Sequence, residues 1–188
     1  MKHSEVKNRI VETASALFYK QGYNSTGINE IIEKSGIAKA TLYNHFKSKD
    51  DLCLAYLQLK NTTFLEDIST YCAAKEEGKA RVLAIFDFLQ LFFKDKDFNG
   101  CWCIKTVSEI PQDNEVIRKE IQRQKTLFID VIKELVNDNL KNTQTDLGTE
   151  ALAKQIYLLY EGAVGESHLH QEDWPIKQAR QICAQIIA

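Results

Sequence analysis

A short stretch of the chain, residues 38–49, concentrates side chains of the types that hydrogen-bond to nucleic acid. It includes the second of two short segments with helical apolar spacing, 26–34 and 38–46, which are separated by Ser35-Gly36-Ile37. Glycine adopts the backbone conformation that a sharp turn needs and that a residue with a Cβ resists. Two short helices around such a turn form a helix-turn-helix, whose second helix enters the major groove of DNA.

Burial of the apolar side chains would leave one polar face of the second short helix in solvent. We expect the two helices to pack through Ile31, Ile37, Leu42 and Phe46 against Ile10, Ala14 and Phe18 of a first helix. The outward set is then Lys39, Ala40, Thr41, Tyr43, Asn44 and His45, with Lys47 and Lys49 after the helix. Small residues allow close approach, and the polar groups suit base edges and phosphates. The turn alone fits an ordinary helical hairpin equally well.

A longer motif around this turn resembles the DNA-binding signature of the TetR family of transcriptional regulators. It reads Gly22-Tyr23-x-x-Thr26-x-Ile28-x-Glu30-Ile31-x-x-x-Ser35-Gly36-Ile37-x-Lys39-x-Thr41-Leu42-Tyr43-x-His45-Phe46-x-Ser48-Lys49-Asp50-x-Leu52. The resemblance implies a homodimer that places one head on each half-site of a palindromic DNA operator. It further implies repression of transcription until a small ligand binds the C-terminal body.

The resemblance also assigns roles to individual side chains. Phosphate contacts are expected from Thr26, Tyr43, His45 and Lys49, and base contacts from Lys39, Ala40, Thr41 and Asn44. The chain departs from the family pattern at Ile32, Ala38 and Ala40. Ala38 stands where the family often has a capping serine, and a lost cap is worth about 1 kcal/mol. These departures affect the expected operator sequence more than DNA binding itself.

The rest of the chain also predicts helices, so we expect an all-α fold. Apolar spacing predicts a helix over 4–21 before the turn, with Thr26 capping the helix that follows it. Further helices are expected at 50–72, 78–95, 102–110, 113–141, 148–170 and 174–187, with a polar joint at 142–145. We expect a helix-turn-helix domain over residues 1–49 and a helical ligand-binding and dimerisation domain over 50–188.

Composition and charge exclude several classes of protein. Apolar residues make up 44% of the chain and charged residues 27%, which rules out a disordered tail. The 2 prolines and 8 glycines are too few for the turns of an all-β sandwich. Residues 1–60 carry a net charge of +3 within a chain of net charge -2, as expected if only the head meets a polyanion. No apolar run is long enough to span a bilayer, and we expect a cytoplasmic location.

The last two predicted helices carry apolar stripes suited to dimerisation. The predicted contact residues are Ile156, Leu159, Ala163, Ala179, Ile182 and Ile186, while Gly162 and Gly165 would allow close helix approach. The stripes fit packing on the chain's own body equally well, and the family resemblance favours a dimer formed by a four-helix bundle.

Aromatic residues indicate where a small apolar or aromatic effector would bind. The predicted ligand-binding residues are Phe88, Phe92, Trp102, Phe128, Tyr157 and Tyr160. Aromatic stripes are more often core than pocket, but ligand sites use apolar walls with a few polar groups.

Cys101 is a candidate sensor thiol. The five cysteines have no disulfide-like spacing and are expected to be reduced. The segment from Gly100 to Glu109 resembles a stretch found in the N-ethylmaleimide repressor branch of the family, in which a thiol at this position responds to electrophiles. Lys105 and the adjacent helix start are expected to stabilise the thiolate. The alternative is a small buried Cys that fills space, so an electrophile- or oxidant-sensing repressor remains an alternative to ligand release.

The sequence gives little support to two other classes of function. The sequence contains no phosphate-binding loop, nucleophile elbow or paired acids that would indicate an enzyme, so no enzymatic activity is predicted. A helical adaptor that binds only protein has no need of the polar set around Gly36. His168 and His170 are two residues apart and point to different sides of a helix, so neither a metal nor another cofactor is expected.

Overall fold

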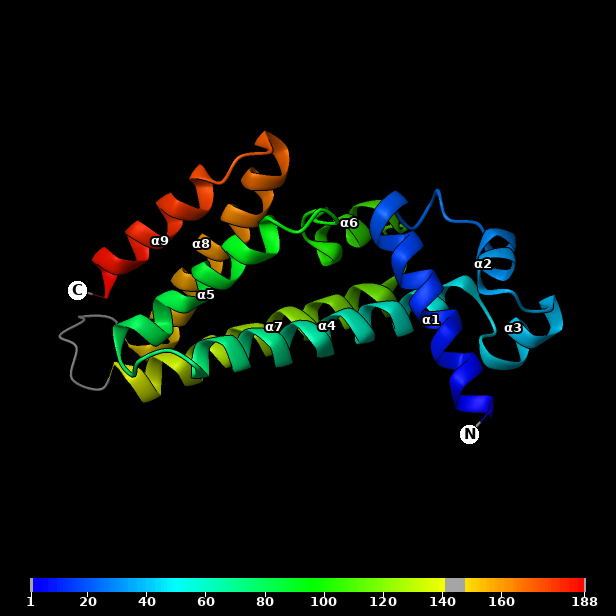
Figure 1. Ribbon diagram of the computed structural model, residues 1–188, viewed down its shortest axis with the longest axis horizontal. Helices are drawn as coiled ribbons and strands as arrows, with labels where there is room; N and C mark the ends of the chain where they lie inside the picture. Colours follow the sequence, from blue (N-terminus) through cyan, green and yellow to red (C-terminus); the bar gives the residue numbers. More distant parts are fainter. Residues whose placement is uncertain (1, 141–147, 188) are drawn as a thin grey trace. The chain divides into compact units, whose positions relative to one another are not determined.

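The computed structural model describes residues 2–140 and 148–187, and within these ranges every regular element is a helix (Figure 1). The helices are α1 (Lys2–Gln21), α2 (Ile28–Ser35), α3 (Lys39–His45), α4 (Lys49–Ala73), α5 (Lys79–Phe93), α6 (Trp102–Glu109), α7 (Glu115–Asn139), α8 (Thr149–His170) and α9 (Trp174–Ile186). The all-α prediction is confirmed, and each described helix begins and ends close to its predicted bounds. The predicted joint at 142–145 lies outside the described residues.

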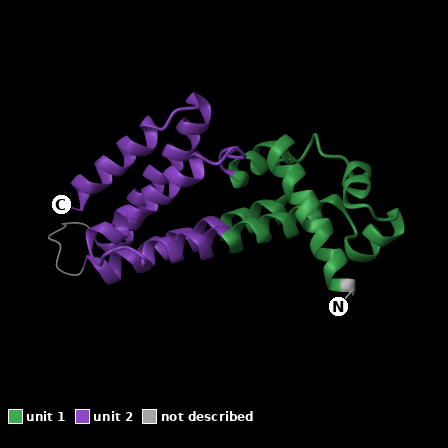
Figure 2. Ribbon diagram, viewed as in Figure 1, with its two compact units in different colours: residues 1–63, 102–123 green, residues 64–101, 124–188 purple. Residues whose placement is uncertain are grey.

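The chain divides into two compact units, which Figure 2 distinguishes by colour. The first contains residues 1–63 and 102–123, and the second contains residues 64–101 and 124–188. The first unit therefore extends beyond the predicted head of residues 1–49. One reason is that Tyr56 of α4 is buried and its ring centroid lies 5.5 Å from that of Phe18 in α1. The start of α4 is thus part of the core that supports the head.

The core of the first unit forms largely as the apolar spacing predicts, except that Ile37 is only half-buried. Ile10, Ala14 and Phe18 of α1 are buried together with Ile31 of α2 and Leu42 of α3. Phe46 is also buried, directly after α3. These apolar contacts fix α3 to α1 and α2, which leaves the other face of α3 for solvent or a partner.

The second unit is a helical body in which α5 packs against α8 and α9. Its core includes the fully buried residues Ile85 and Leu89 of α5, Ile132 of α7 and Ile156 of α8, with Cys183 of α9. Burial of large apolar side chains stabilises such a body by roughly 1.5–3 kcal/mol for each side chain.

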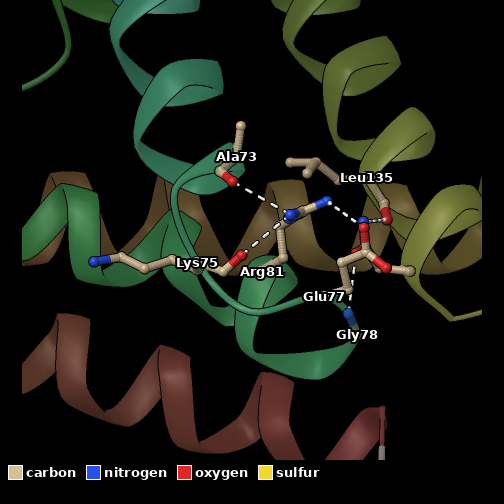
Figure 3. Close-up of polar contacts among 7 residues, drawn as sticks. Ala73, Lys75, Glu77, Gly78, Arg81 and Leu135 are labelled. Carbon is tan, nitrogen blue, oxygen red and sulfur yellow. Dashed lines mark hydrogen bonds and ion pairs between the residues drawn. The ribbon is translucent and has the colours of Figure 1, made fainter.

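Arg81 stabilises the connection between α4 and α5 in the second unit by hydrogen bonds. Arg81 Nη2 donates to the carbonyl oxygens of Ala73 and Lys75, at 3.2 and 3.1 Å, as Figure 3 shows. In the same region the Gly78 N–H donates to Asn139 Oδ1 at 3.0 Å. Carbonyl groups at a helix end have no partner within the helix, so these bonds hold the end of α4 in place.

Among the residues that the structure describes, no helix is both long and apolar enough to cross a membrane.

Candidate nucleic-acid interface

The turn between α2 and α3 depends on Gly36. This glycine ends α2 in the left-handed conformation, with φ 63° and ψ 40°. Its N–H donates to Glu33 O at 3.1 Å, and the N–H of Ile37 donates to Ile32 O at 3.3 Å. A residue with a Cβ adopts this conformation at an energetic cost. The predicted role of Gly36 in a tight helix-turn-helix turn is confirmed.

The exposed face of α3 carries the residues that the sequence predicts. Leu42 is fully buried, whereas the side chains of Lys39, Ala40, Tyr43 and Asn44 are exposed. Thr41 and His45 are half-buried. Tyr43 is 46% exposed. The face therefore presents an ammonium, an amide and a phenol on one side of a short helix, with the small Ala40 beside them.

The start of α3 lacks a side-chain cap. Ala38 is the N-cap residue, with φ -76° and ψ 150°, and it offers no side-chain acceptor to the first free N–H groups. These N–H groups remain available to an anion, because the first turn of a helix has no acceptors of its own.

The structure does not give Thr26 its predicted role as the N-cap of α2. The N-cap of α2 is Gly27 and not Thr26, and no side-chain cap bond forms there. The Thr26 side chain is fully buried and its hydroxyl donates to Gly22 O at 2.7 Å. Its hydroxyl thus stabilises the turn after α1 and does not face the surface, where the phosphate contact predicted for it would have to form.

Lys49 lies beside the head with its ammonium close to an aromatic ring. Its Nζ is 4.3 Å from the centroid of the Tyr23 ring, a cation–π distance. Partial burial lowers the pKa of Lys49 from its ordinary value. The Tyr23 hydroxyl donates to Asp50 Oδ1, and burial followed by this acidic neighbour raises the Tyr23 pKa. Asp50 Oδ2 also accepts from Asn114 Nδ2 at 2.8 Å.

Helix α6 holds the turn that follows α1, which sequence reasoning missed. The Glu109 carboxylate accepts the Asn24 N–H at 2.8 Å, and the Glu109 carbonyl accepts Asn24 Nδ2 at 2.9 Å. Gly22 has φ 93°, which favours glycine, and a Cβ there would lie 2.2 Å from Glu109 Oε1, so that the carboxylate would have to move. Lys105 Nζ donates to Tyr19 O and Lys20 O at 3.0 and 3.2 Å. Helix α6 thereby caps the C-terminal end of α1.

A second polar cluster lies within the body and contains the candidate thiol. Lys125 Nζ of α7 lies 3.1 Å from Cys101 Sγ and 2.6 Å from Glu161 Oε1 of α8. The lysine and glutamate side chains are each only 18% exposed. The sequence predicted Lys105 as the cation beside this thiol, and this prediction is wrong because Lys105 is bonded to the end of α1. Lys125 was missed because it is 24 residues from Cys101 in the chain.

Most of the predicted effector-site aromatics form one cluster in the body. The Phe128 ring lies 5.0 Å from Tyr160 and 6.1 Å from Tyr157, between centroids. Phe64, which the sequence did not single out, joins them at 5.0 Å from Phe128 and 6.1 Å from Phe88. The remaining two predicted residues differ. The Phe92 ring packs 5.3 Å from Phe98, and Trp102 belongs to the first unit.

The predicted dimer residues are largely used within the chain itself. Ile156, Ala163 and Ala179 are buried in the core of the second unit, whereas Leu159, Ile182 and Ile186 are half-buried. The exposed apolar positions of α8 are Leu158 and Leu169, which are 67% and 72% exposed. Gly162 and Gly165 lie between them at helical spacing, and a Cβ at either would meet nothing within 4 Å. This strip, Leu158, Gly162, Gly165 and Leu169, is called the α8 face below.

The two histidines at the end of α8 have different partners. His168 Nε2 lies 3.0 Å from Asn99 Oδ1, and His170 Nε2 lies 3.2 Å from Glu166 Oε2. They do not converge on one point.

An all-helical chain with a helix-turn-helix head and a separate helical body defines a DNA-binding transcriptional regulator of the helix-turn-helix class. Residues 10–56 match the family model described as bacterial regulatory proteins, tetR family, and residues 78–183 match the tetracyclin repressor-like C-terminal domain. The chain belongs to the TetR family, as its motif indicated.

Named relatives and solved structures agree with this assignment. The transcriptional repressor NemR of Escherichia coli K12 is 21% identical over the whole chain and 97% of its own length. The transcriptional activator FasR of Mycolicibacterium smegmatis is 32% identical over 46% of this chain, and the matched part covers 41% of the length of that relative. The crystal structure of reduced E. coli NemR has a TM-score of 0.87 at 18% identity, covering 97% of both chains.

A TetR-family regulator from Streptomyces coelicolor has a TM-score of 0.86 at 23% identity, covering 97% of this chain and 88% of that one. At these identities the solved structures show a shared fold.

Proposed function

We propose that this protein is a repressor that binds a palindromic operator as a homodimer and leaves it when a small ligand binds the body. The observation that carries the proposal is the exposed face of α3, where Lys39, Tyr43 and Asn44 project from a helix fixed by the buried Leu42. Such a face suits the major groove, in which ammonium and amide groups read base edges.

The proposal divides the roles on this face. Lys39, Ala40, Thr41 and Asn44 are assigned to bases, and Tyr43 and His45 of the same helix are assigned to phosphates together with Lys49. Phosphate contacts strengthen binding to every sequence, and base contacts decide which sequence is preferred.

An electrophoretic shift assay with duplex DNA selected from a random pool tests this function. Tyr43→Phe removes one hydroxyl from each head, and we expect the affinity of the dimer to fall about tenfold for all bound sequences. Tyr71→Phe, which removes a hydroxyl from the body, is the matched control and should bind like the parent protein. Equal affinities for Tyr43→Phe and the parent would remove the phosphate role of Tyr43, and a parent that ignores all duplexes at low salt would overturn the function.

The α8 face supports the homodimer. Leu158 and Leu169 are exposed, and the glycines between them allow the backbone of a second helix to approach closely. The partner is a second copy of this chain, because a palindromic operator requires two symmetric heads. Leu158→Lys should convert the dimer to a monomer in size-exclusion chromatography with light scattering. Leu91→Lys, on the exposed side of α5, is the control that should leave the dimer intact.

The aromatic cluster of the body supports an apolar or aromatic effector. Phe64, Phe88, Phe128, Tyr157 and Tyr160 bring aromatic rings from four helices together, with two phenol groups among them. A ligand that binds only the folded protein raises its melting temperature. A panel of naphthalene-type compounds in a thermal shift assay tests the site, and Phe128→Ala should remove any shift that the parent shows.

A second candidate function, sensing of reactive electrophiles by Cys101, is favoured by the position of Lys125. Its ammonium at 3.1 Å from Cys101 Sγ stabilises a thiolate, which is the nucleophilic form of cysteine. The other four cysteines are buried, and burial raises the pKa of Cys72 to about 11 and that of Cys183 to about 12. Cys101 is thus the thiol with both partial exposure and a neighbouring cation.

Alkylation with iodoacetamide at pH 7.5, followed by peptide mapping, tests the thiol. In this reaction the thiolate sulfur bonds to the methylene carbon as the carbon–iodine bond breaks, iodide leaves, and the thiol proton goes to solvent. We expect Cys101 to react much faster than Cys183, and the modified protein to bind its operator less tightly. If Cys101 reacts no faster than Cys183, sensing by this thiol is excluded while DNA binding is unaffected.

A further inference from the structure

The cluster around Lys125 places one cation between two acidic groups. Its ammonium lies 3.1 Å from Cys101 Sγ and 2.6 Å from Glu161 Oε1, so the thiol and the carboxyl group share the same positive charge. The charge of Cys101 and a hydrogen bond with it both raise the pKa of Glu161. The protonation of Glu161 is therefore coupled to the state of Cys101.

Burial strengthens the electrostatic interactions of Lys125 with its two acidic neighbours. The side chains of Lys125 and Glu161 are each 18% exposed, so water screens their charges weakly. Two negative charges beside one ammonium are unfavourable in such a place. The state with a thiolate and a protonated carboxyl group and the state with a thiol and a carboxylate each carry one negative charge, and they have the same net charge.

We propose that Glu161 is a positioning residue that restrains Cys101 by competing with its thiolate for Lys125. This inference rests on the second candidate function, the sensing of electrophiles by Cys101. When Glu161 is ionised it holds the Lys125 ammonium and disfavours the thiolate. When Glu161 is protonated, Lys125 is left to stabilise the thiolate. The reactivity of Cys101 is thus set by a carboxyl group on another helix.

The titration of Glu161 falls in the range where this competition matters. Burial, and then the charge of Cys101, raise the pKa of Glu161 to about 7 even though Lys125 opposes the shift. Near neutral pH, the protonated and ionised forms of Glu161 are therefore both populated.

Other titratable groups on the same elements require controls. Lys125 is a charged neighbour of Glu161 on α7, and Cys101 lies on the segment before α6. On α8 itself, Tyr157 lies one turn before Glu161 and His168 lies two turns after it. The His168 ring packs against Gly100, because a Cβ there would lie 3.0 Å from His168 Cγ. His168→Gln is a control that removes this imidazole.

A specific shape of the pH dependence follows. The rate at Cys101 should rise with pH up to about 7, level off as Glu161 ionises, and rise again at higher pH. The plateau appears because the two states of equal net charge exchange without gain or loss of a proton. With Glu161→Gln the carboxylate is absent, so the rate should rise in a single step. At pH 8 the variant should react about tenfold faster than the parent, since about one tenth of Glu161 is then protonated.

The experiment measures the iodoacetamide rate at Cys101 between pH 5.5 and 9.5 in the whole 188-residue chain, by mass spectrometry of the Cys101 peptide. The parent alone tests the two-step profile, so the result does not depend on the folding of a variant. Lys125→Met should slow Cys101 at neutral pH, and Glu166→Gln, an exposed change on the same helix, should behave like the parent.

A two-step parent profile with a faster, single-step Glu161→Gln variant supports the proposal. A single-step parent profile, or a Glu161→Gln variant no faster than the parent at pH 8, overturns it. In either of these cases a Cys101 that still reacts faster than Cys183 leaves the sensor thiol standing. The failure of this inference is therefore distinguishable from the failure of the proposed function.

Discussion

The α3 surface and the Cys101 cluster handle polar groups in opposite ways. On α3, Lys39, Tyr43 and Asn44 stand in water on a frame of buried apolar side chains. In the body, Lys125 and Glu161 are mostly withdrawn from water, and they satisfy each other and Cys101. Exposed groups keep their ordinary properties until a partner replaces water, whereas withdrawn groups change one another. The first arrangement suits recognition of a large polyanion, and the second suits control of one reactive atom.

Salt should separate the two regions most strongly. Between 50 and 200 mM salt, we expect affinity for DNA to fall about 10³-fold, because the lysines of two heads displace counterions from phosphates. Over the same range the iodoacetamide rate at Cys101 should change less than about twofold, since buried pairs are weakly screened. Fluorescence anisotropy with labelled duplex and thiol alkylation in matched buffers measure both. A salt-sensitive Cys101 rate would show that the cluster is open to solvent.

Leu42→Ala should disrupt the frame that holds α3. This side chain is fully buried, and its truncation should lower the free energy of unfolding by about 2–5 kcal/mol, with loss of DNA binding. Urea denaturation followed by circular dichroism measures the loss. Leu91→Ala removes the same atoms from a position that is 53% exposed and should change stability by less than about 0.5 kcal/mol. Equal effects of the two changes would contradict the packing described for the head.

Asn44→Ala should change which operator is preferred. An exposed amide on α3 contributes about 1–3 kcal/mol of discrimination at one base pair of each half-site. Selection of bound duplexes from a random pool, repeated with the variant, would show relaxed preference at that position and retained preference elsewhere. If affinity falls equally for all sequences, Asn44 contacts phosphate.

Ala38→Ser should produce the smallest effect. The backbone of Ala38 already has the extended conformation of an N-cap residue, so a serine hydroxyl there can accept a free N–H of α3. We expect an increase in unfolding free energy of about 0.5–1 kcal/mol, measured by thermal denaturation. The Cys101 alkylation rate should remain that of the parent, because the change lies in the other unit.

The head was predicted more completely than the body, and the reason is the range of the contacts involved. Gly36, Leu42 and most outward residues of α3 follow from spacing within about ten residues and lie where that spacing placed them. Thr41 and His45 are the exceptions, because both are half-buried. The buried Thr26 hydroxyl was missed because it turns back to Gly22 O, a choice that capping preferences do not reveal.

The body depends on partners far apart in the chain. Glu161 is 36 residues from Lys125, and no spacing rule joins α7 to α8. For the same reason the apolar positions of α8 were correctly read as a stripe, but Ile156 and Ala163 turned out to belong to the chain's own core. Apolar spacing identifies a packed face without identifying what packs on it.

The bonds between α6 and the turn after α1 bear on how the protein is made. Asn24 and Glu109 are 85 residues apart, so the helix-turn-helix segment lacks its hydrogen bonds to α6 until the ribosome has passed residue 109. At about 5–20 residues per second, the delay after residue 49 is on the order of several seconds. In a nascent chain, α3 is therefore synthesised several seconds before the contacts from α6 that stabilise the head can form.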